Sequence, residues 1–230
     1  MGELVGIGIY TAAEASRLLK VPSRKINRWL RGHETNGRFY EPLWTPQVSL
    51  GDDQLYLGFR DLMEIRVAAA FIDLGIPAQR VRAAIELARD AHSIEYPLSA
   101  DSFRYAGREI FLRVFERDET GAERERLIST FRRQYVIEDV LRPLLKNIDF
   151  AEDGSPRLWW PKGRAGHIVI DPLRAFGQPI DAETSVPTAI LAGAAKNDGP
   201  EAAARNFEVP VAAVRRAISF EAGLAERLAA

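Results

Sequence analysis

Three dipeptides in which proline follows valine or isoleucine interrupt apolar helical patterns in this chain. They are Val21-Pro22, Ile76-Pro77 and Val209-Pro210. Proline lacks an amide N–H and fixes φ, so it suits the first turn of a helix. It also pushes the preceding residue out of the α region, which changes the chain direction. Each dipeptide therefore predicts a tight corner between two helices, with its valine or isoleucine held between them.

The composition narrows the class of protein. The chain has 230 residues, of which 47% are hydrophobic, and it contains no cysteine. This length predicts one or two domains with a buried core. The absence of cysteine excludes disulfide frameworks, thiolate metal sites and cysteine nucleophiles. No apolar run approaches the roughly 20 residues of a membrane span. We expect a cytoplasmic protein with no membrane contact.

The charge is unevenly distributed along a nearly neutral chain. There are 31 Lys+Arg against 32 Asp+Glu, a formal net charge of −1. Residues 1–50 carry 7 basic and 4 acidic side chains, so only this part is positive. A local positive patch on a neutral protein is typical of a nucleic-acid contact at one end of the molecule.

The corner at Val21-Pro22 carries the strongest indication of DNA binding. Thr11 predicts an N-cap, and Glu14, three residues later, completes a capping box. After the corner, apolar residues at helical spacing predict an inward face. The polar residues between them would point outward: Ser23, Arg24, Lys25, Asn27, Arg28 and Arg31.

Every residue of this outward face can donate a hydrogen bond, and none is an acid. Arg and Lys suit guanine, Asn suits adenine and Ser suits phosphate, so the face predicts a helix that reads the major groove. The alternative is a solvated face of a structural helical hairpin. The turn signal Asn36-Gly37, followed by β-favouring residues, predicts a wing beside this helix with Arg38 near a phosphate.

The rest of the chain predicts a mixed architecture. Residues 103–115 alternate apolar and polar side chains about Gly107, and with a second turn at 118–121 they predict strands. A short helix is expected at 135–145. The acidic, Gly- and Pro-containing stretch 151–156 predicts a linker and domain boundary. Two short strands (158–160 and 167–170), a helix from Thr188 to Ala195, the third corner and a terminal Ala-rich helix complete the expected order.

The first 90 residues or so resemble the MerR-type winged helix–turn–helix. The matching segments are YTAAEASRLLKVPSRKINRWLRG from Tyr10, an interval of wing length, and FRDLMEIRVAAAFIDLGIP from Phe59. MerR activators continue into a long dimerisation helix, whereas this chain continues into sequence with a β-like pattern. The resemblance therefore implies a DNA-binding module and not a metal- or redox-responsive activator.

The C-terminal part resembles a short domain of VapB-like antitoxins that are encoded beside PIN-like ribonuclease toxins. The carried pattern is Ile168-Val169-Ile170-Asp171-Pro172, Phe176-Gly177-Gln178-Pro179-Ile180, Val186-Pro187 and the corner at Val209-Pro210. The family usually has Gly-Thr-Arg-Ile-Pro where this chain has Glu183–Pro187. The resemblance implies an antitoxin whose partner is a PIN-like toxin.

The sequence offers no enzymatic constellation. His33, His92 and His167 lack metal-ligand spacing. There is no phosphate loop, dinucleotide glycine motif or nucleophile elbow. We expect no enzyme activity, no catalytic residue, no cofactor and no metal.

Candidate protein contacts lie near the C-terminus. Trp159 and Trp160 could be anchors for a protein partner, or they could fill a core, as could Trp44. Arg215 and Arg216 at the third corner could meet an acidic nuclease pocket or phosphate, or form a solvated face. These four residues, Trp159, Trp160, Arg215 and Arg216, are the candidate toxin contacts.

The combined prediction is a mainly α protein with small β elements (α+β). Its expected parts are a winged helix–turn–helix over 1–92, a central strand and helix segment over 93–150, and an antitoxin-type domain over 157–230. The expected function is an antitoxin that neutralises a PIN-like ribonuclease and represses its own operator. We expect a homodimer or a toxin–antitoxin hetero-oligomer. The alternatives are a MerR-like regulator that senses a ligand or partner through its C-terminal half, and an adaptor that never meets DNA.

Overall fold

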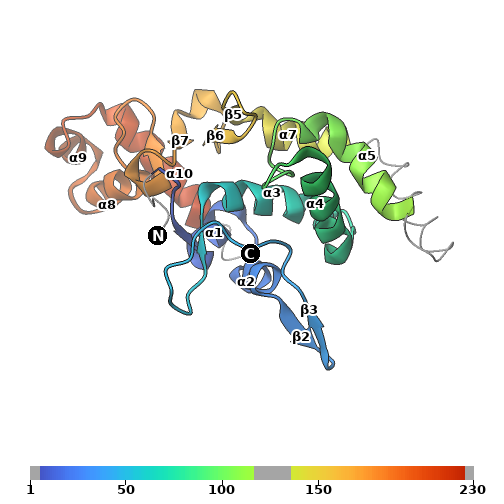
Figure 1. The fold of residues 1–230 in the computed structure, drawn as a ribbon. Coiled ribbons are helices and arrows are strands. Elements are labelled where there is room, and N and C mark those ends of the chain that lie inside the picture. Colours follow the sequence, from blue (N-terminus) through green and yellow to red (C-terminus); the bar gives the residue numbers. More distant parts are fainter. Residues whose placement is uncertain (1–5, 117–135, 226–230) are drawn as a thin grey trace.

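The computed structural model describes residues 6–116 and 136–225. The described part is mostly helical with three small antiparallel sheets, which confirms the predicted fold class. Figure 1 shows α3 (Phe59–Asp73) in the middle of an elongated molecule. Helices α1 (Ala12–Leu19) and α2 (Ser23–Arg31) lie on one side of it, and the four-stranded sheet and α7 (Val136–Lys146) lie on the other.

The first two helices form the predicted corner. The Thr11 hydroxyl accepts from the Glu14 N–H at 3.2 Å, and the Glu14 carboxylate accepts from the Thr11 N–H at 2.8 Å, so the capping box is present. Helix α1 ends at Lys20, which adopts a left-handed conformation with φ 62°. Val21 is buried, and Pro22 immediately precedes α2. The expected corner is therefore confirmed.

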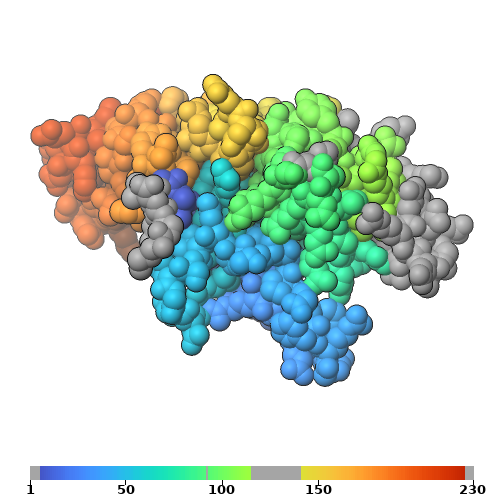
Figure 2. Space-filling model, in the orientation of Figure 1, coloured from blue at the N-terminus to red at the C-terminus, as the bar shows by residue number. Residues whose placement is uncertain are grey.

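A two-stranded hairpin follows α2, as predicted for a wing. It consists of β2 (His33–Thr35) and β3 (Arg38–Tyr40), in antiparallel register. Asn36 and Gly37 at its tip have φ of 52° and 72°. Two consecutive positive φ values are what a two-residue type I′ turn requires, and Asn-Gly meets this requirement at low cost. Figure 2 shows the hairpin protruding from the body of the molecule.

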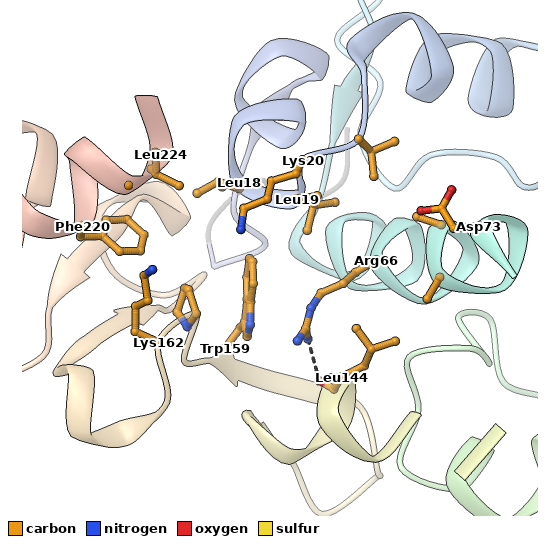
Figure 3. A pocket seen from close by; sticks show the side chains of 15 residues that line it. Leu18, Leu19, Lys20, Arg66, Asp73, Leu144, Trp159, Lys162, Phe220 and Leu224 are labelled. Carbon is orange, nitrogen blue, oxygen red and sulfur yellow. Dashed lines mark hydrogen bonds between the residues drawn. The ribbon is translucent and has the colours of Figure 1, made fainter. Parts of the chain in front are cut away.

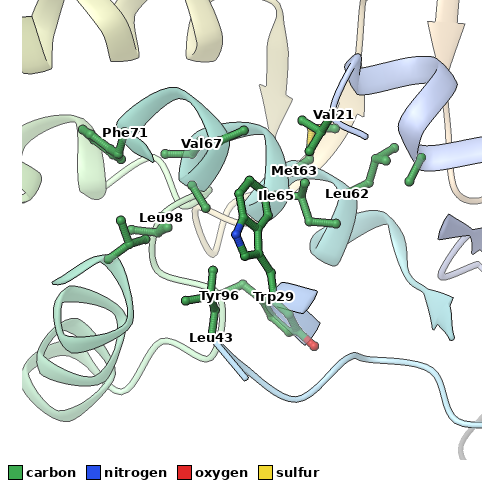
Figure 4. Close-up of a cluster of buried hydrophobic side chains, with 14 of the residues drawn as sticks. Val21, Trp29, Leu43, Leu62, Met63, Ile65, Val67, Phe71, Tyr96 and Leu98 are labelled. Carbon is green, nitrogen blue, oxygen red and sulfur yellow. The ribbon is translucent and has the colours of Figure 1, made fainter. Parts of the chain in front are cut away.

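The core is built around α3, which is buried on almost all sides. Figure 4 shows Trp29 of α2 packed against this helix beside Leu43. The strand pair β1 (Tyr10–Thr11) and β4 (Tyr56–Leu57) closes one end of this cluster. At the start of α3, the buried carboxylate of Asp61 accepts hydrogen bonds of 2.8 Å from the Gly58 N–H, the Gln47 N–H and the Trp44 indole N–H. This carboxylate therefore ties the segment after the wing to the central helix.

The predicted strands over residues 103–115 are wrong. These residues form α5 (Phe103–Glu116), which packs against α4 (Ala78–His92). Its buried positions recur at helical spacing, and Phe103 and Phe111 contact Phe71 of α3. Gly107, expected in a turn, is buried inside the helix, where an added Cβ would lie 2.9 Å from the Phe103 ring. The turn expected at 118–121 lies outside the described residues.

The stretch expected to be a linker is the turn of a β-hairpin. Strands β5 (Ile148–Phe150) and β6 (Pro156–Trp159) pair across it. The sheet continues through β7 (Ile168–Ile170) and β8 (Pro179–Asp181). The buried apolar cluster around α3 also includes Trp159, Phe220 and Leu224. The division into three domains stays a prediction, but its second boundary falls inside this hairpin.

Three helices complete the described chain. They are α8 (Thr188–Asp198), α9 (Pro200–Asn206) and α10 (Val211–Ala225), which surround a small cluster of buried alanine, leucine and valine side chains. The corner at Val209-Pro210 separates α9 from α10, as predicted. Polar contacts join the C-terminal part of the chain to the N-terminal segment: the buried Tyr10 hydroxyl donates to the Gly177 carbonyl at 2.8 Å, and Arg17 pairs with Glu221 at 3.4 Å.

A buried glutamate predicts pH-dependent stability. Glu64 of α3 is fully buried and accepts from the N–H groups of Leu98 and Ser99 at 3.0 and 2.8 Å. Burial raises its pKa to about 7, because the backbone hydrogen bonds only partly offset desolvation. An unfolded chain loses this proton near pH 4.5, so stability is expected to fall as pH rises from about 4.5 to 7, by up to about 3 kcal/mol.

The variant Glu64→Gln isolates this effect because it cannot ionise. We expect its thermal midpoint to lie below that of the wild type at pH 5, since one accepted hydrogen bond is lost at a cost of about 1–3 kcal/mol. The difference between the two proteins should shrink towards pH 8. A constant difference across this range, measured by thermal denaturation, would assign the pH dependence to other groups.

Candidate nucleic-acid interface

The predicted cationic face lies on the outer side of α2. Its residues define what we call the α2 face: Ser23, Arg24, Lys25, Asn27, Arg28 and Arg31. Ser23, Arg24, Arg28 and Arg31 are exposed, and Lys25 and Asn27 are half-buried. The apolar side chains between them, Ile26, Trp29 and Leu30, are buried as predicted. The amphipathic pattern of the sequence therefore places the donors outward.

Half of these donors are engaged inside the protein. The Lys25 ammonium lies 3.3 Å from an Asp73 carboxylate oxygen, the Asn27 amide donates to the Ser23 carbonyl at 2.9 Å, and Arg31 donates to the Asp53 carbonyl. Arg24 and Arg28 make no ion pair or hydrogen bond with other described residues. These two guanidinium groups are the donors that are already available to an external partner.

The structure brings cations from three elements to one cleft. Arg28 of α2, Arg38 of the wing and Arg82 of α4 line a hollow of about 130 Å³, which adjoins a second one of about 360 Å³ beside Lys25 and Gln79. Arg82 also contacts Glu86 on its own helix at 3.4 Å. Gln79 and Arg82 were not predicted as site residues. The sequence feature that could have identified them is their position in the first turns of the helix after Pro77.

The wing is fixed against α2 by tight backbone packing. Gly32, between α2 and β2, has φ 71°, and a Cβ there would lie 2.6 Å from the Tyr40 carbonyl oxygen. The Arg38 guanidinium lies 5.4 Å from the Tyr40 ring centroid, and the His33 and Tyr40 rings stack at 5.0 Å. Arg38 is thereby held beside the cleft, where the sequence placed a phosphate contact.

The two candidate tryptophans have different environments. Trp159 is buried at 5% exposure, within the core around α3. It is therefore not an exposed anchor, and the core-filling alternative holds for it and for Trp44. Trp160 is half-buried: its indole N–H donates to Asp149 at 3.1 Å, and the Arg164 guanidinium lies over its ring at 5.4 Å. Only Trp160 offers part of its surface to a partner.

The two candidate arginines also differ. Arg216 lies 2.7 Å from the fully buried Asp181 and 2.9 Å from Glu183, so it stabilises the junction between β8 and α10. Arg215 is exposed and pairs with Glu201 at 2.9 Å. A solvent-exposed pair of this kind contributes about 0–1 kcal/mol, so Arg215 can exchange its partner at low cost.

The structure reveals an apolar protrusion that includes Phe176 of the antitoxin-like pattern and that was not predicted as a contact site. Leu173 and Phe176, between β7 and β8, are 75% and 77% exposed. Ala175 and Phe176 both have positive φ, of 47° and 53°. Such conformations cost about 1–2 kcal/mol per residue, so the surrounding contacts must hold this backbone in place. The Phe176 carbonyl accepts from the Ile9 N–H at 3.1 Å, so the backbone is held while the side chain faces solvent.

The described residues contain no metal-ligand cluster. Within residues 6–116 and 136–225, no three His, Asp or Glu side chains gather as they would around a metal ion. In the same ranges, no helix combines the length and apolar character needed to cross a bilayer.

Comparison with known proteins gives matches to proteins from Mycobacterium tuberculosis. The chain is 28% identical over 185 residues to a protein of strain ATCC 25618 / H37Rv provisionally named antitoxin VapB45, and the match spans 76% of this chain and 77% of that protein. It is 31% identical over 98 residues to the uncharacterized protein Rv2308 of the same strain, which spans 40% of this chain and 37% of that protein.

The third similarity is structural. The crystal structure of Rv2018 superposes with a TM-score of 0.71 and 26% identity, covering 93% of this chain and 99% of that one. No family model matches the sequence. The similarity over three quarters of both chains supports a VapB-like antitoxin.

Proposed function

We propose that this protein is the antitoxin of a type II toxin–antitoxin pair, that it neutralises a PIN-like ribonuclease, and that it represses its own operator. The observation that carries the proposal is the similarity to VapB45 over 76% of the chain. The C-terminal pattern that resembles antitoxin domains extends from β7 to the corner before α10 and includes the segment between β7 and β8.

The operator would be bound by the α2 face. Arg24 and Arg28 are exposed on a helix whose other side is buried, and the neighbouring Arg38 and Arg82 would contact the phosphates beside the groove. One module of this size buries too little surface for specific affinity. Two copies on half-sites one helical turn apart would supply the rest, so we propose a dimer on DNA.

The toxin would be bound by the protrusion that carries Leu173 and Phe176. Exposed aromatic side chains on a fixed backbone lose little entropy on binding, which is typical of interface hot spots. Trp160 and Arg215 are the two sequence-predicted contacts that retain accessible surface. The resemblance to antitoxins implies how such contact would inhibit: PIN-like toxins use clustered acids and a divalent metal, so covering that pocket is sufficient.

The alternative function is a regulator without a toxin, in which the C-terminal half responds to a ligand or another partner. The neighbouring reading frame separates the two functions. A PIN-like gene beside this one favours the antitoxin, and its absence favours the regulator. An adaptor that never meets DNA would show no binding to its own upstream region.

Co-expression with the adjacent gene product tests the antitoxin proposal. We expect the two proteins to purify together, and the ribonuclease activity of the partner to disappear in the complex. Replacing Leu173 and Phe176 with alanine should weaken the complex by about 30-fold or more, the effect of losing a hot spot of about 2 kcal/mol. DNA binding should not change.

Tyr105→Ala is the matched control, since Tyr105 is an 80% exposed aromatic residue on α5. If the double substitution lowers the affinity for the toxin no more than Tyr105→Ala does, the toxin does not bind at the protrusion. A PIN-like partner that neither binds this protein nor loses activity in its presence would refute the antitoxin function.

A further inference from the structure

A third cleft, also cationic, lies between the N-terminal helices and the C-terminal part of the described chain. It has a volume of about 460 Å³ and is bounded by α1, α3, α7, β6 and α10 (Figure 3). Three cationic side chains line it: Lys20, Arg66 and Lys162. Much of the remaining wall is apolar and comes from Leu18, Leu19, Val21, Ala69, Leu144, Trp159, Phe220 and Leu224.

Arg66 is the most constrained of these cations. Its guanidinium donates to the Leu144 carbonyl at 2.7 Å and lies 4.8 Å from the Trp159 ring centroid. Burial lowers its pKa to about 10. No carboxylate pairs with it in the described part of the chain. A charge that is removed from water without a counter-ion is costly, so a site that keeps one is suited to receive an anion.

The other two cations, Lys20 and Lys162, add positive charge to the same cleft. Lys20 follows the last residue of α1 and has a left-handed backbone conformation. Lys162 follows β6 and approaches α10 near Gly223. Figure 3 shows the Lys20 side chain reaching toward Trp159, and Lys162 between Trp159 and Phe220. Neither forms an ion pair with another described residue. The acid in the lining, Asp73, is paired with Lys25 of α2 at 3.3 Å.

We propose that this cleft binds a small organic anion, a carboxylate or phosphate carried on an apolar body. The three cations would hold the anionic group, and the wall around Trp159 and Phe220 would cover the apolar body. A volume of about 460 Å³ falls within the range of roughly 300–1,000 Å³ that is usual for small-molecule sites. The site does not depend on the toxin or on the operator.

The position of the cleft gives ligand binding a structural consequence. Lys20 and Val21 belong to the α1–α2 corner, whereas Trp159 lies on β6 and Phe220 on α10. A ligand held by all of them connects the first corner to the sheet and to the last helix. Binding should therefore raise the thermal midpoint of the whole protein.

Four probes of stated chemistry test the site on the full chain: phenyl phosphate, benzoate, neutral benzamide and inorganic phosphate. We expect phenyl phosphate and benzoate to bind at least about tenfold more tightly than benzamide, the effect of one charged hydrogen bond. Phenyl phosphate should also bind more tightly than inorganic phosphate. Ligand-observed NMR gives the affinities, and the anions should raise the thermal midpoint by about 2–4 °C at a few times Kd.

The variant Lys20→Gln/Lys162→Gln should weaken the binding of both anions by about tenfold or more. Lys146→Gln/Lys196→Gln, which changes two exposed lysines outside the lining, should leave it unchanged. Equal affinity for benzamide and benzoate, or equal loss of affinity in both double variants, would overturn the proposal. The absence of binding at a probe concentration of about 10 mM, which exceeds the Kd of weak small-molecule complexes, would overturn it too. Equal affinity for inorganic and phenyl phosphate would overturn the assignment of the apolar wall.

Discussion

The double variant Arg24→Ala/Arg28→Ala is expected to lose about 30-fold to 10⁴-fold in affinity for the upstream DNA of its own gene. Each arginine that makes a bidentate base contact contributes about 1–3 kcal/mol, and the two side chains are the α2-face cations that have no partner among the described residues. If instead they contact phosphates, binding should also become less dependent on salt, with the slope of log K against log salt reduced by about 2.

DNA binding is measured by fluorescence anisotropy at salt concentrations from about 50 to 200 mM. Across this range, a protein with several phosphate contacts loses affinity by a factor on the order of 10³–10⁵. Lys196→Ala/Arg205→Ala is the matched control, since it removes two exposed cations from α8 and α9. Unchanged affinity in the Arg24/Arg28 variant would remove the α2 face from the DNA contact. Equal loss in both double variants would indicate only a general effect of charge.

Asp61→Ala is expected to destabilise the fold by about 3–5 kcal/mol. The substitution leaves three donors without their acceptor: the Gly58 N–H, the Gln47 N–H and the Trp44 indole N–H. An unsatisfied buried donor costs about 1–3 kcal/mol. Burial raises the pKa of Asp61, and this desolvation of the native carboxylate keeps the total below the sum of three such costs.

Chemical denaturation measures this loss, and Asp73→Ala provides the comparison on the same helix. Asp73 is exposed and makes one ion pair, with Lys25, so its removal should cost no more than about 1 kcal/mol. Similar midpoints for the two variants would show that the Asp61 contacts contribute little to stability.

Local chemistry explains why the corners and the wing could be predicted. Thr11 and Glu14 specify a capping box within four residues, and Asn36-Gly37 meets the backbone requirement of a two-residue turn. The conformation of the valine or isoleucine before each proline is restricted by sterics that act between neighbours in sequence. No distant residue is needed for any of these features.

The segment 103–115 could not be predicted in the same way because its pattern fits two periods. Its alternation suggested strands, yet Phe103, Ile110 and Val114 also recur at helical spacing, and all three are buried in α5. Tertiary contact with Phe71 decided between them. The stretch at 151–156 was similarly ambiguous, since acidic, Gly- and Pro-containing residues suit a hairpin turn as well as a linker.

The site was predictable only in part. The donors of α2 follow from one helical face, whereas Arg82 joins them through the packing of α4 beside the wing. The burial of Trp159 depends on Arg66 and on residues of α10, and the contact between Tyr10 and Gly177 joins residues 167 positions apart. Such pairings cannot be derived from spacing along the chain.

The continuous apolar cluster from Tyr10 to Leu224 has a practical consequence for dissecting the protein. Cleavage or truncation between residues 150 and 156 would separate β5 from β6 and expose Trp159 together with the faces of α3 and α10 that it covers. Both fragments would lose part of the larger apolar cluster, although the C-terminal fragment would keep the smaller one among α8, α9 and α10. Deletion studies that assign one role to each half would therefore measure misfolding, whereas point substitutions on the surface keep the two roles separable.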